Sequence, residues 1–223
     1  MLLLAADTSG KHGSIALARA ESDSFEVIEV VPLIGGTFSA QLVPQIAALL
    51  SRHGFSKQDV GGFAVASGPG SFTGLRVGLA AIKALAEVLG RPIAAVSLLE
   101  AVAVASGARG KVMAVLDAGR GELYVGEYDV TGELAKCLQE RILVRDQLEQ
   151  TLDGSATVTP DANVAELARG AGLKVHEIER PRSDAIARVG WKKILAGDTV
   201  SPEALEANYI RRSDAEIFAG PGP

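Results

Sequence analysis

The order of apolar and polar positions along the chain predicts an alternation of strands and helices. Short apolar runs bounded by turn residues are typical of buried strands, whereas apolar positions three and four apart indicate helices. We expect strands at 2–6, 14–18, 25–31, 63–67, 93–96, 111–116 and 122–130. We expect helices at 39–53, 72–89, 98–105, 163–171 and 184–196. This alternation favours an α/β fold.

Two helices of the first half have the clearest signals. Ser39 is the expected N-cap of the first of them, and Gly54 ends it. Its apolar positions share one face: Leu42, Val43, Ile46, Leu49 and Leu50. In the second helix, Gly74 and Gly78 lie four residues apart, so another element can approach closely. These surfaces pack either in the core of the chain or against another subunit, and the pattern leaves both open.

The two halves of the chain begin with the same pattern. LLLAADTSGKHGSIALA contains an apolar strand, Asp7, a turn of small residues and a second strand, and KVMAVLDAGRGELYVGE repeats this order around Asp117. The repeat indicates two related lobes, with coincidence as the alternative because Asp is common in turns. We place an N-terminal lobe at 1–107, a C-terminal lobe at 108–218 and a disordered tail at 219–223.

Composition narrows the classes of function. No apolar stretch approaches the roughly 20 residues that span a bilayer, so we expect no membrane association. A single cysteine, Cys137, excludes an internal disulfide and fits a cytoplasmic protein. The net charge of −5 argues against a dedicated nucleic-acid binder, whose affinity would come from clustered Lys and Arg.

The segment 66–92 has the most unusual pattern, a strand followed by Gly-Pro-Gly-Ser and a helix. Glycines let backbone amides approach a ligand, and a helix N-terminus favours an anion. The turn is therefore a phosphate-contacting loop or a tight structural turn; Arg76 is the only nearby cation. Asp7 and Asp117, the aspartates of the repeat, are either candidate ligands of a magnesium ion or turn residues. The candidate nucleotide cleft comprises Asp7, Thr8, Ser9, Gly68, Pro69, Gly70, Ser71 and Asp117.

No pattern predicts catalysis by this chain. The three histidines, His12, His53 and His176, are scattered, so no metal site is expected. Ser67 and Ser71 do not lie in a Gly-x-Ser-x-Gly elbow. A peptidase or another hydrolase is therefore unsupported, and we expect no catalytic residue.

Several motifs resemble the TsaB family of the actin-like ATPase superfamily. They lie at 4–9, 39–44, 68–78, 97–101, 117–124 and 208–211, and they cover most of the chain in order. The segment 68–78 is the most specific of them. The resemblance implies two actin-like, ribonuclease H-like lobes, each a mixed sheet flanked by helices.

The resemblance also implies a function in threonylcarbamoyladenosine modification of tRNA. The chain would be a non-catalytic partner of a TsaD-like transferase and a TsaE-like ATPase, would contact tRNA only through the complex, and would form a homodimer when alone. The expected partner interface is Gln41, Leu42, Pro44, Gln45, Leu49, Leu75, Arg76, Leu79 and Ile82. The alternative is a stand-alone ATP-binding enzyme, a small kinase or ATPase, with ATP or ADP between the lobes.

The chain departs from related patterns at two places. TsaD-like enzymes carry a His-x-x-x-His metal motif after the strand that follows the glycine-loop helix, and here Leu98 and Val102 occupy those positions. Aliphatic side chains cannot bind a metal, so we expect a packed or dry pocket. Members of the TsaB family often have a His before the Ser of the first helix, where this chain has Phe38. We expect this change to affect an interface at most.

Overall fold

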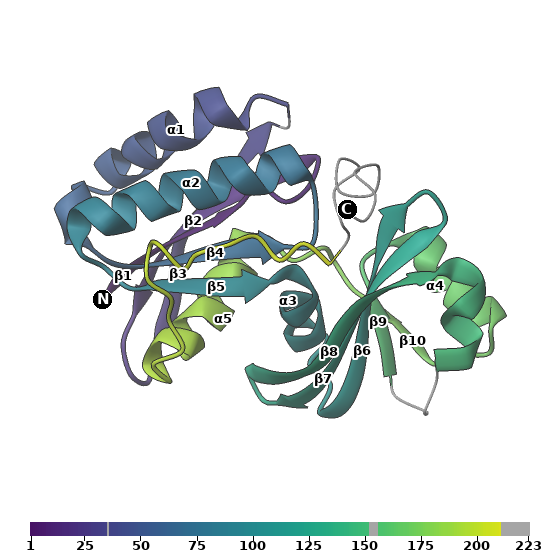
Figure 1. The fold of residues 1–223 in the computed structure, drawn as a ribbon. Coiled ribbons are helices and arrows are strands. Elements are labelled where there is room, and N and C mark those ends of the chain that lie inside the picture. Colours follow the sequence, from purple (N-terminus) through teal and green to yellow (C-terminus); the bar gives the residue numbers. More distant parts are fainter. Residues whose placement is uncertain (35, 152–155, 211–223) are drawn as a thin grey trace, which may run out of the picture.

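Two five-stranded sheets form the framework of the computed structural model, which describes residues 1–34, 36–151 and 156–210 (Figure 1). The first sheet contains β1 (Leu2–Asp7), β2 (His12–Ala20), β3 (Phe25–Ile34), β4 (Val60–Gly68) and β5 (Ile93–Ser97). The second contains β6 (Gly110–Gly119), β7 (Glu122–Thr131), β8 (Leu134–Val144), β9 (Ala156–Thr159) and β10 (Val175–Glu177). The helices are α1 (Phe38–Arg52), α2 (Phe72–Leu89), α3 (Leu98–Ala105), α4 (Ala162–Gly170) and α5 (Ser183–Leu195), with short 3-10 turns at Lys57–Asp59 and Arg145–Thr151.

The two sheets have the same topology. The first has the order β3-β2-β1-β4-β5, and the second, taken from its other edge, has the order β8-β7-β6-β9-β10. In each sheet the first three strands are antiparallel and the last two run parallel to the first strand of the lobe. This arrangement is ribonuclease H-like, so the predicted fold class of two mixed sheets flanked by helices is confirmed. The sequence repeat around Asp7 and Asp117 thus marks the first hairpin of each lobe.

Helices cover both faces of the first sheet (Figure 1). Alternate residues of β1 belong to different core clusters: Leu4 packs with residues of α1 and α2, and Leu3 packs with residues of α3 and α5. A strand buried on both sides carries a continuous apolar run, which explains the sequence LLLAAD of β1. Gly190 of α5 allows close packing, since a Cβ there would lie 2.4 Å from Cβ of Ala64.

The two lobes do not correspond to two consecutive halves of the chain. Helix α5 comes from the second half but contacts β1, β2, β4 and β5 of the first sheet, and α3 contacts both sheets. One core cluster therefore contains Leu3 and Ala64 of the first sheet together with Val112 and Leu116 of the second. The division of the chain into lobes at 107/108 remains a prediction. One of the helices that cover the first sheet, α5, lies after this division in the sequence. The predicted tail at 219–223 lies outside the described residues.

The predicted bounds of α1, α4 and α5 are each shifted by one residue at both ends. The bounds of α2 and α3 are as expected, and Ser71 caps α2 by accepting a hydrogen bond from the backbone N–H of Gly74. The prediction that Ser39 caps α1 is wrong, because the N-cap is Thr37. Phe38 is buried at the start of the helix, and its ring lies so close to Gly13 that a Cβ there would be 2.8 Å away. Because this contact fixes the position of Phe38, the helix begins one residue before Ser39.

Three strands of the second lobe, β8, β9 and β10, were not among the expected elements. Most residues of β8 are exposed or half-buried because β8 lies at the edge of its sheet, so it lacks an apolar run. Strand β10 has only three residues. Of the helices in the described parts of the chain, none is long and apolar enough to cross a membrane.

Candidate functional site

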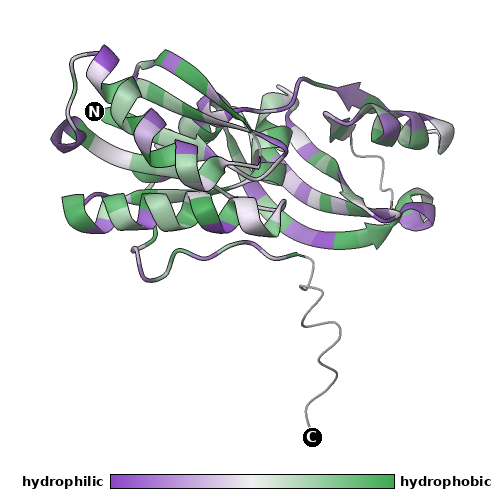
Figure 2. Cartoon of the chain, turned by 90° about the horizontal axis from the view of Figure 1, so that it is seen from above, coloured by the Kyte–Doolittle hydropathy of each residue, from purple (hydrophilic) through white to green (hydrophobic). Residues whose placement is uncertain are grey.

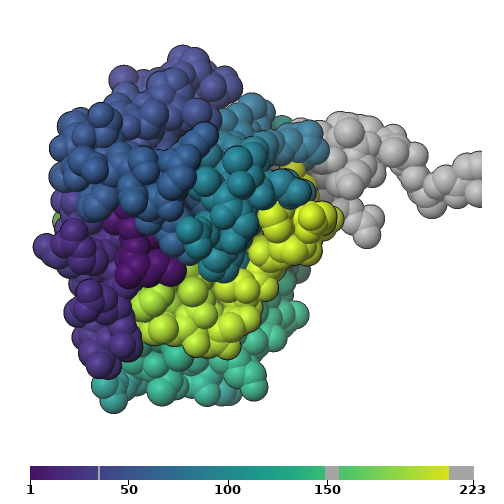
Figure 3. Space-filling view, turned by 90° about the vertical axis from the view of Figure 1, so that its left-hand side faces the viewer, coloured from purple at the N-terminus to yellow at the C-terminus, as the bar shows by residue number. Residues whose placement is uncertain are grey.

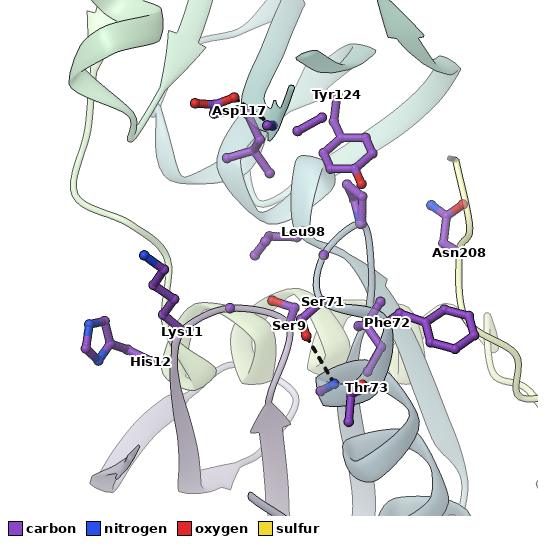
Figure 4. A pocket seen from close by; sticks show the side chains of 18 of the residues that line it. Ser9, Lys11, His12, Ser71, Phe72, Thr73, Leu98, Asp117, Tyr124 and Asn208 are labelled. Atoms are coloured by element: carbon purple, nitrogen blue, oxygen red, sulfur yellow. Dashed lines mark hydrogen bonds between the residues drawn. The ribbon is translucent and has the colours of Figure 1, made fainter. Parts of the chain in front are cut away.

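A cleft of about 1380 Å³ lies between the two lobes. The first lobe contributes the β1–β2 turn, the glycine loop and the start of α2, and the second lobe contributes the β6–β7 turn. In Figure 4, Asp117 and Tyr124 lie across the cleft from Ser9 and Ser71. Five of the eight residues expected at a nucleotide cleft line this space: Ser9, Pro69, Gly70, Ser71 and Asp117. The other three, Asp7, Thr8 and Gly68, lie behind the lining and are buried.

The glycine loop packs tightly against the β1–β2 turn. The backbone N–H of Ser71 donates to the carbonyl of Ser9 at 2.7 Å, and the hydroxyl of Thr8 donates to the carbonyl of Gly74 at 2.7 Å. A Cβ on the glycines of this segment would lie 2.3, 2.1 and 2.3 Å from atoms of Thr8 or Ser9, at Gly70, Gly74 and Gly78 respectively. Close backbone packing alone therefore accounts for these glycines, which favours the structural explanation of the loop. Phosphate binding by the loop remains a hypothesis.

Asp7 is enclosed at the end of β1. Its Oδ1 accepts hydrogen bonds from the backbone N–H of Ser9 at 2.8 Å and from the Ser9 hydroxyl at 2.6 Å. Burial raises the pKa of the Asp7 carboxyl, and the two bonds from Ser9 and the charge of Arg180 oppose this rise only in part. One of its oxygens is thus already used within the β1–β2 turn.

Asp117 has a more open environment at the corresponding place in the second lobe. Its Oδ2 accepts from Arg145 at 3.0 Å and from Asn163 at 2.8 Å, and its Oδ1 accepts from the backbone N–H of Gly119 at 2.8 Å. Burial alone would raise the pKa of Asp117, but these hydrogen bonds and the charge of Arg145 outweigh it and hold the pKa below its usual value. In the described part of the chain, His, Cys, Asp and Glu residues form no group of three that could hold a metal ion.

Leu98 and Val102 are the residues expected from the sequence at the positions of the metal motif of TsaD-like enzymes. Both side chains are buried in the core cluster that joins the lobes, and Leu98 also lines the cleft. Neither side chain has an atom that can ligate a metal. Phe38, the other departure, is buried and lines the same cleft from the start of α1, so its ring lies at the cleft and in the core below α1.

The structure places most of the residues of the predicted partner interface in the core. Five of the nine residues are buried in the core between the helices and the first sheet, where they cannot contact a partner: Leu42, Leu49, Leu75, Leu79 and Ile82. The other four, Gln41, Pro44, Gln45 and Arg76, are exposed or half-buried. The prediction chose the face of each helix that packs on its own sheet, because apolar spacing does not distinguish a core from a subunit interface.

The opposite sides of α1 and α2 are also apolar. We define the outer face as seven of the exposed apolar residues of the two helices: Val43, Pro44, Ala47 and Ala48 of α1, and Ala80, Ala84 and Val88 of α2. Val43 is 52% exposed and Val88 is 75% exposed. Seen from above, the two helices lie side by side and show long hydrophobic segments (Figure 2). Apolar residues that alternate with few polar ones on the outer side of a helix indicate a second contact surface, and this signal could have identified the outer face from the sequence.

The duplicated sheets and the cleft between their first hairpins define a two-lobed protein of the ribonuclease H-like class. The sequence profile of TsaD, tRNA N6-adenosine threonylcarbamoyltransferase, matches residues 30–198. This chain therefore belongs to the TsaD-related family that includes the TsaB proteins.

Similarity to known proteins extends over nearly the whole chain. It is 29% identical to the tRNA threonylcarbamoyladenosine biosynthesis protein TsaB of Bacillus subtilis, with 97% of this chain and 96% of the relative covered. It is 26% identical to TsaB of Escherichia coli, with 96% of each chain covered. Among solved structures, YeaZ from Pseudomonas aeruginosa superposes with a TM-score of 0.74 at 23% identity, covering 93% of this chain and 99% of that one. The last similarity concerns the fold alone.

Proposed function

We propose that this chain is a subunit for threonylcarbamoyladenosine biosynthesis in tRNA and that it acts by binding a TsaD-like transferase. The full-length similarity to TsaB proteins supports the pathway. The observation that carries the mode of action is the outer face, an apolar surface on two adjacent helices. Exposed apolar surface of this kind marks protein interaction sites. We place the protein in the cytoplasm, with a TsaE-like ATPase in the same complex and tRNA contacted only through that complex.

The chemistry of the outer face indicates helix-on-helix contact. Its residues are small or β-branched, so a second pair of helices can approach at close interaxial distance. A TsaD-like subunit would offer the related helices of its own lobe, and so would a second copy of this chain. Because both partners would use one surface, self-association and complex formation would compete. Gln41, Gln45 and Arg76 lie beside this surface and supply the polar rim that interfaces usually have.

The test is a reconstitution of tRNA modification with Val43→Glu or Ala84→Glu. A charge in the centre of the interface should lower transferase binding at least tenfold, about 1.4 kcal/mol, and reduce modification accordingly. Both positions are exposed, so the variants should keep the thermal midpoint of the parent protein. Leu134→Glu is the matched control, because Leu134 is an exposed apolar residue of β8 in the second lobe. Unchanged binding in both helix variants would refute the assignment of the interface.

A second candidate function is ATP binding between the lobes, for which the cleft itself is the supporting observation. The cleft brings Ser9, Ser71 and Asp117 together, although the β1–β2 turn already uses the amide of Ser71. Calorimetric titration of the purified chain with Mg-ATP distinguishes the two functions. Micromolar affinity together with turnover would favour the enzyme, and absence of both would favour the binding subunit.

A further inference from the structure

After α5 the chain crosses back over the first lobe toward the second. We call residues 199–210 the brace. Its backbone joins the first sheet where the N–H of Val200 donates to the carbonyl of Ile93 at 2.9 Å, and Leu205 is buried in the core cluster below α2. Figure 1 shows the brace in yellow along β4, and Figure 3 shows it packed beside the teal surface of α2. The brace is therefore part of the first lobe along most of its length.

The end of the brace holds the glycine loop at both of its ends. At the start of the loop, the N–H of Asn208 donates to the carbonyl of Ser67 at 2.7 Å. At its other end, the rings of Tyr209 and Phe72 lie 5.2 Å apart, and Nε of Arg76 donates to the Tyr209 hydroxyl at 3.1 Å. The guanidinium of Arg76 also lies 3.6 Å from the centre of the Phe72 ring. These contacts fix the loop and the first turn of α2 relative to the brace.

The same asparagine connects the brace to the second lobe. The side chain of Asn208 donates to Oε2 of Glu140 on β8 at 2.5 Å. The other oxygen of Glu140 accepts from the Ser97 hydroxyl at 2.5 Å and from the hydroxyl of Tyr128. Ser97 lies where β5 meets α3, and Tyr128 belongs to β7. One half-buried carboxylate thus joins the brace, the first lobe and the second lobe, and hydrogen bonds to a charged acceptor are stronger than neutral ones.

We infer that Asn208 is a latch that couples the glycine loop and the first turn of α2 to the position of the second lobe. Its backbone holds the loop at Ser67, and its side chain holds the second lobe at Glu140. A change in the opening between the lobes therefore moves or releases the start of α2. The inference concerns the conformation of this chain alone, so it does not depend on the identity of the partner.

Hydrogen–deuterium exchange of the full chain tests the latch. In Asn208→Ala, amides of residues 67–76 should exchange at least tenfold faster, while those of β1 and β6 keep their protection. Glu133→Gln is the control: Glu133 makes a different contact between the lobes, with Arg188 at 3.2 Å and Lys192 at 2.9 Å, and does not touch the brace. Unchanged exchange at 67–76 in Asn208→Ala, or an equal change in the control, would overturn the inference.

A second variant covers the case in which Asn208→Ala fails to fold. Glu140→Gln keeps the shape of the side chain and removes its charge, so it weakens the contact from the opposite side. It should also speed exchange at 67–76, and unchanged exchange there would overturn the inference. If Asn208→Ala does fold, combining the two changes should give less than the product of the two separate effects, because the residues share one interaction. Fully multiplicative effects would show that the two residues act independently and would contradict the latch.

Discussion

The two lobes have the same sheet topology, but the turn after the first strand has a different environment in each lobe. In the first lobe, Asp7 is buried and its turn is packed against the glycine loop of α2. In the second lobe, Asp117 is half-exposed and is held by Arg145 and Asn163. The first hairpin of one lobe is thus a packed core element, and that of the other lobe forms a polar wall of the cleft. The two hairpins have the same backbone arrangement, while the surrounding side chains set the properties of each aspartate.

The largest difference should appear when a methyl group is added to each lobe. In Gly74→Ala, the new Cβ would lie 2.1 Å from the carbonyl oxygen of Thr8, so the β1–β2 turn or α2 must move. We expect the free energy of unfolding to fall by about 3 kcal/mol. Gly170 ends α4 in the second lobe and has no atom within 4 Å of a Cβ. Gly170→Ala should therefore raise the free energy of unfolding by less than about 1 kcal/mol.

Urea unfolding of both alanine variants measures this difference. Equal losses at the two glycines would show that the turn of the first lobe is not tightly packed, and would reopen the phosphate-loop explanation of the glycines.

The pH dependence of stability should have opposite signs at the two aspartates. The pKa of Asp7 is raised in the folded state, so stability falls as pH rises from about 4, where an unfolded Asp titrates, through the folded pKa. The pKa of Asp117 is lowered, so its stabilisation is present above about 4 and is lost as pH falls through the folded pKa. Asp7→Asn should remove the fall in stability with rising pH. Asp117→Asn should remove the loss of stability with falling pH, at a cost of about 1 kcal/mol at neutral pH after screening by solvent.

Unfolding free energies of the two asparagine variants and the parent, measured from pH 3 to pH 8, check these signs. A loss of stability in Asp7→Asn that grows with rising pH would contradict the raised pKa of the buried Asp7 carboxyl.

The smallest effect concerns the exposed ion pairs that connect the lobes. Glu133, in the turn between β7 and β8, pairs with Arg188 and Lys192 of α5, and hydrogen bonding and charge from these two residues lower its pKa. Glu133→Gln should lower the free energy of unfolding by about 0.5 kcal/mol. The difference should shrink at 1 M salt, where the screening length is about 3 Å. A larger loss that is independent of salt would mean that this contact resembles the half-buried one at Glu140.

The sequence predicted best those elements whose ends and faces are set by local chemistry. Helix α2 has Ser71 as its cap and Gly90 in the left-handed conformation at its end, so both bounds could be predicted. Strands β1 and β4 are largely apolar and buried because they lie inside the first sheet, whose two faces are covered by helices. Strand β8 was not predicted because it is an edge strand with exposed side chains and has no long apolar run.

The candidate site was predictable only in part. Similar patterns around Asp7 and Asp117 correctly indicated paired hairpins beside one cleft. The sequence could not show that Ser9 already occupies an oxygen of Asp7, because that bond depends on the conformation of the turn. It also could not show which apolar side of α2 meets the sheet, so Leu79 was assigned to the interface and Ala80 was overlooked. The orientation of a helix about its own axis is set by tertiary packing.

The position of α5 has a consequence for biosynthesis. The first sheet is complete once β5 has been made, but the face that carries Leu3 and Ala5 is covered by a helix that begins at Ser183. During translation the part of this apolar face that α5 covers therefore stays exposed until most of the second lobe has been synthesised, and in a fragment of residues 1–107 only α3 would cover this face. Apolar surface that is exposed during folding makes a chain prone to aggregation.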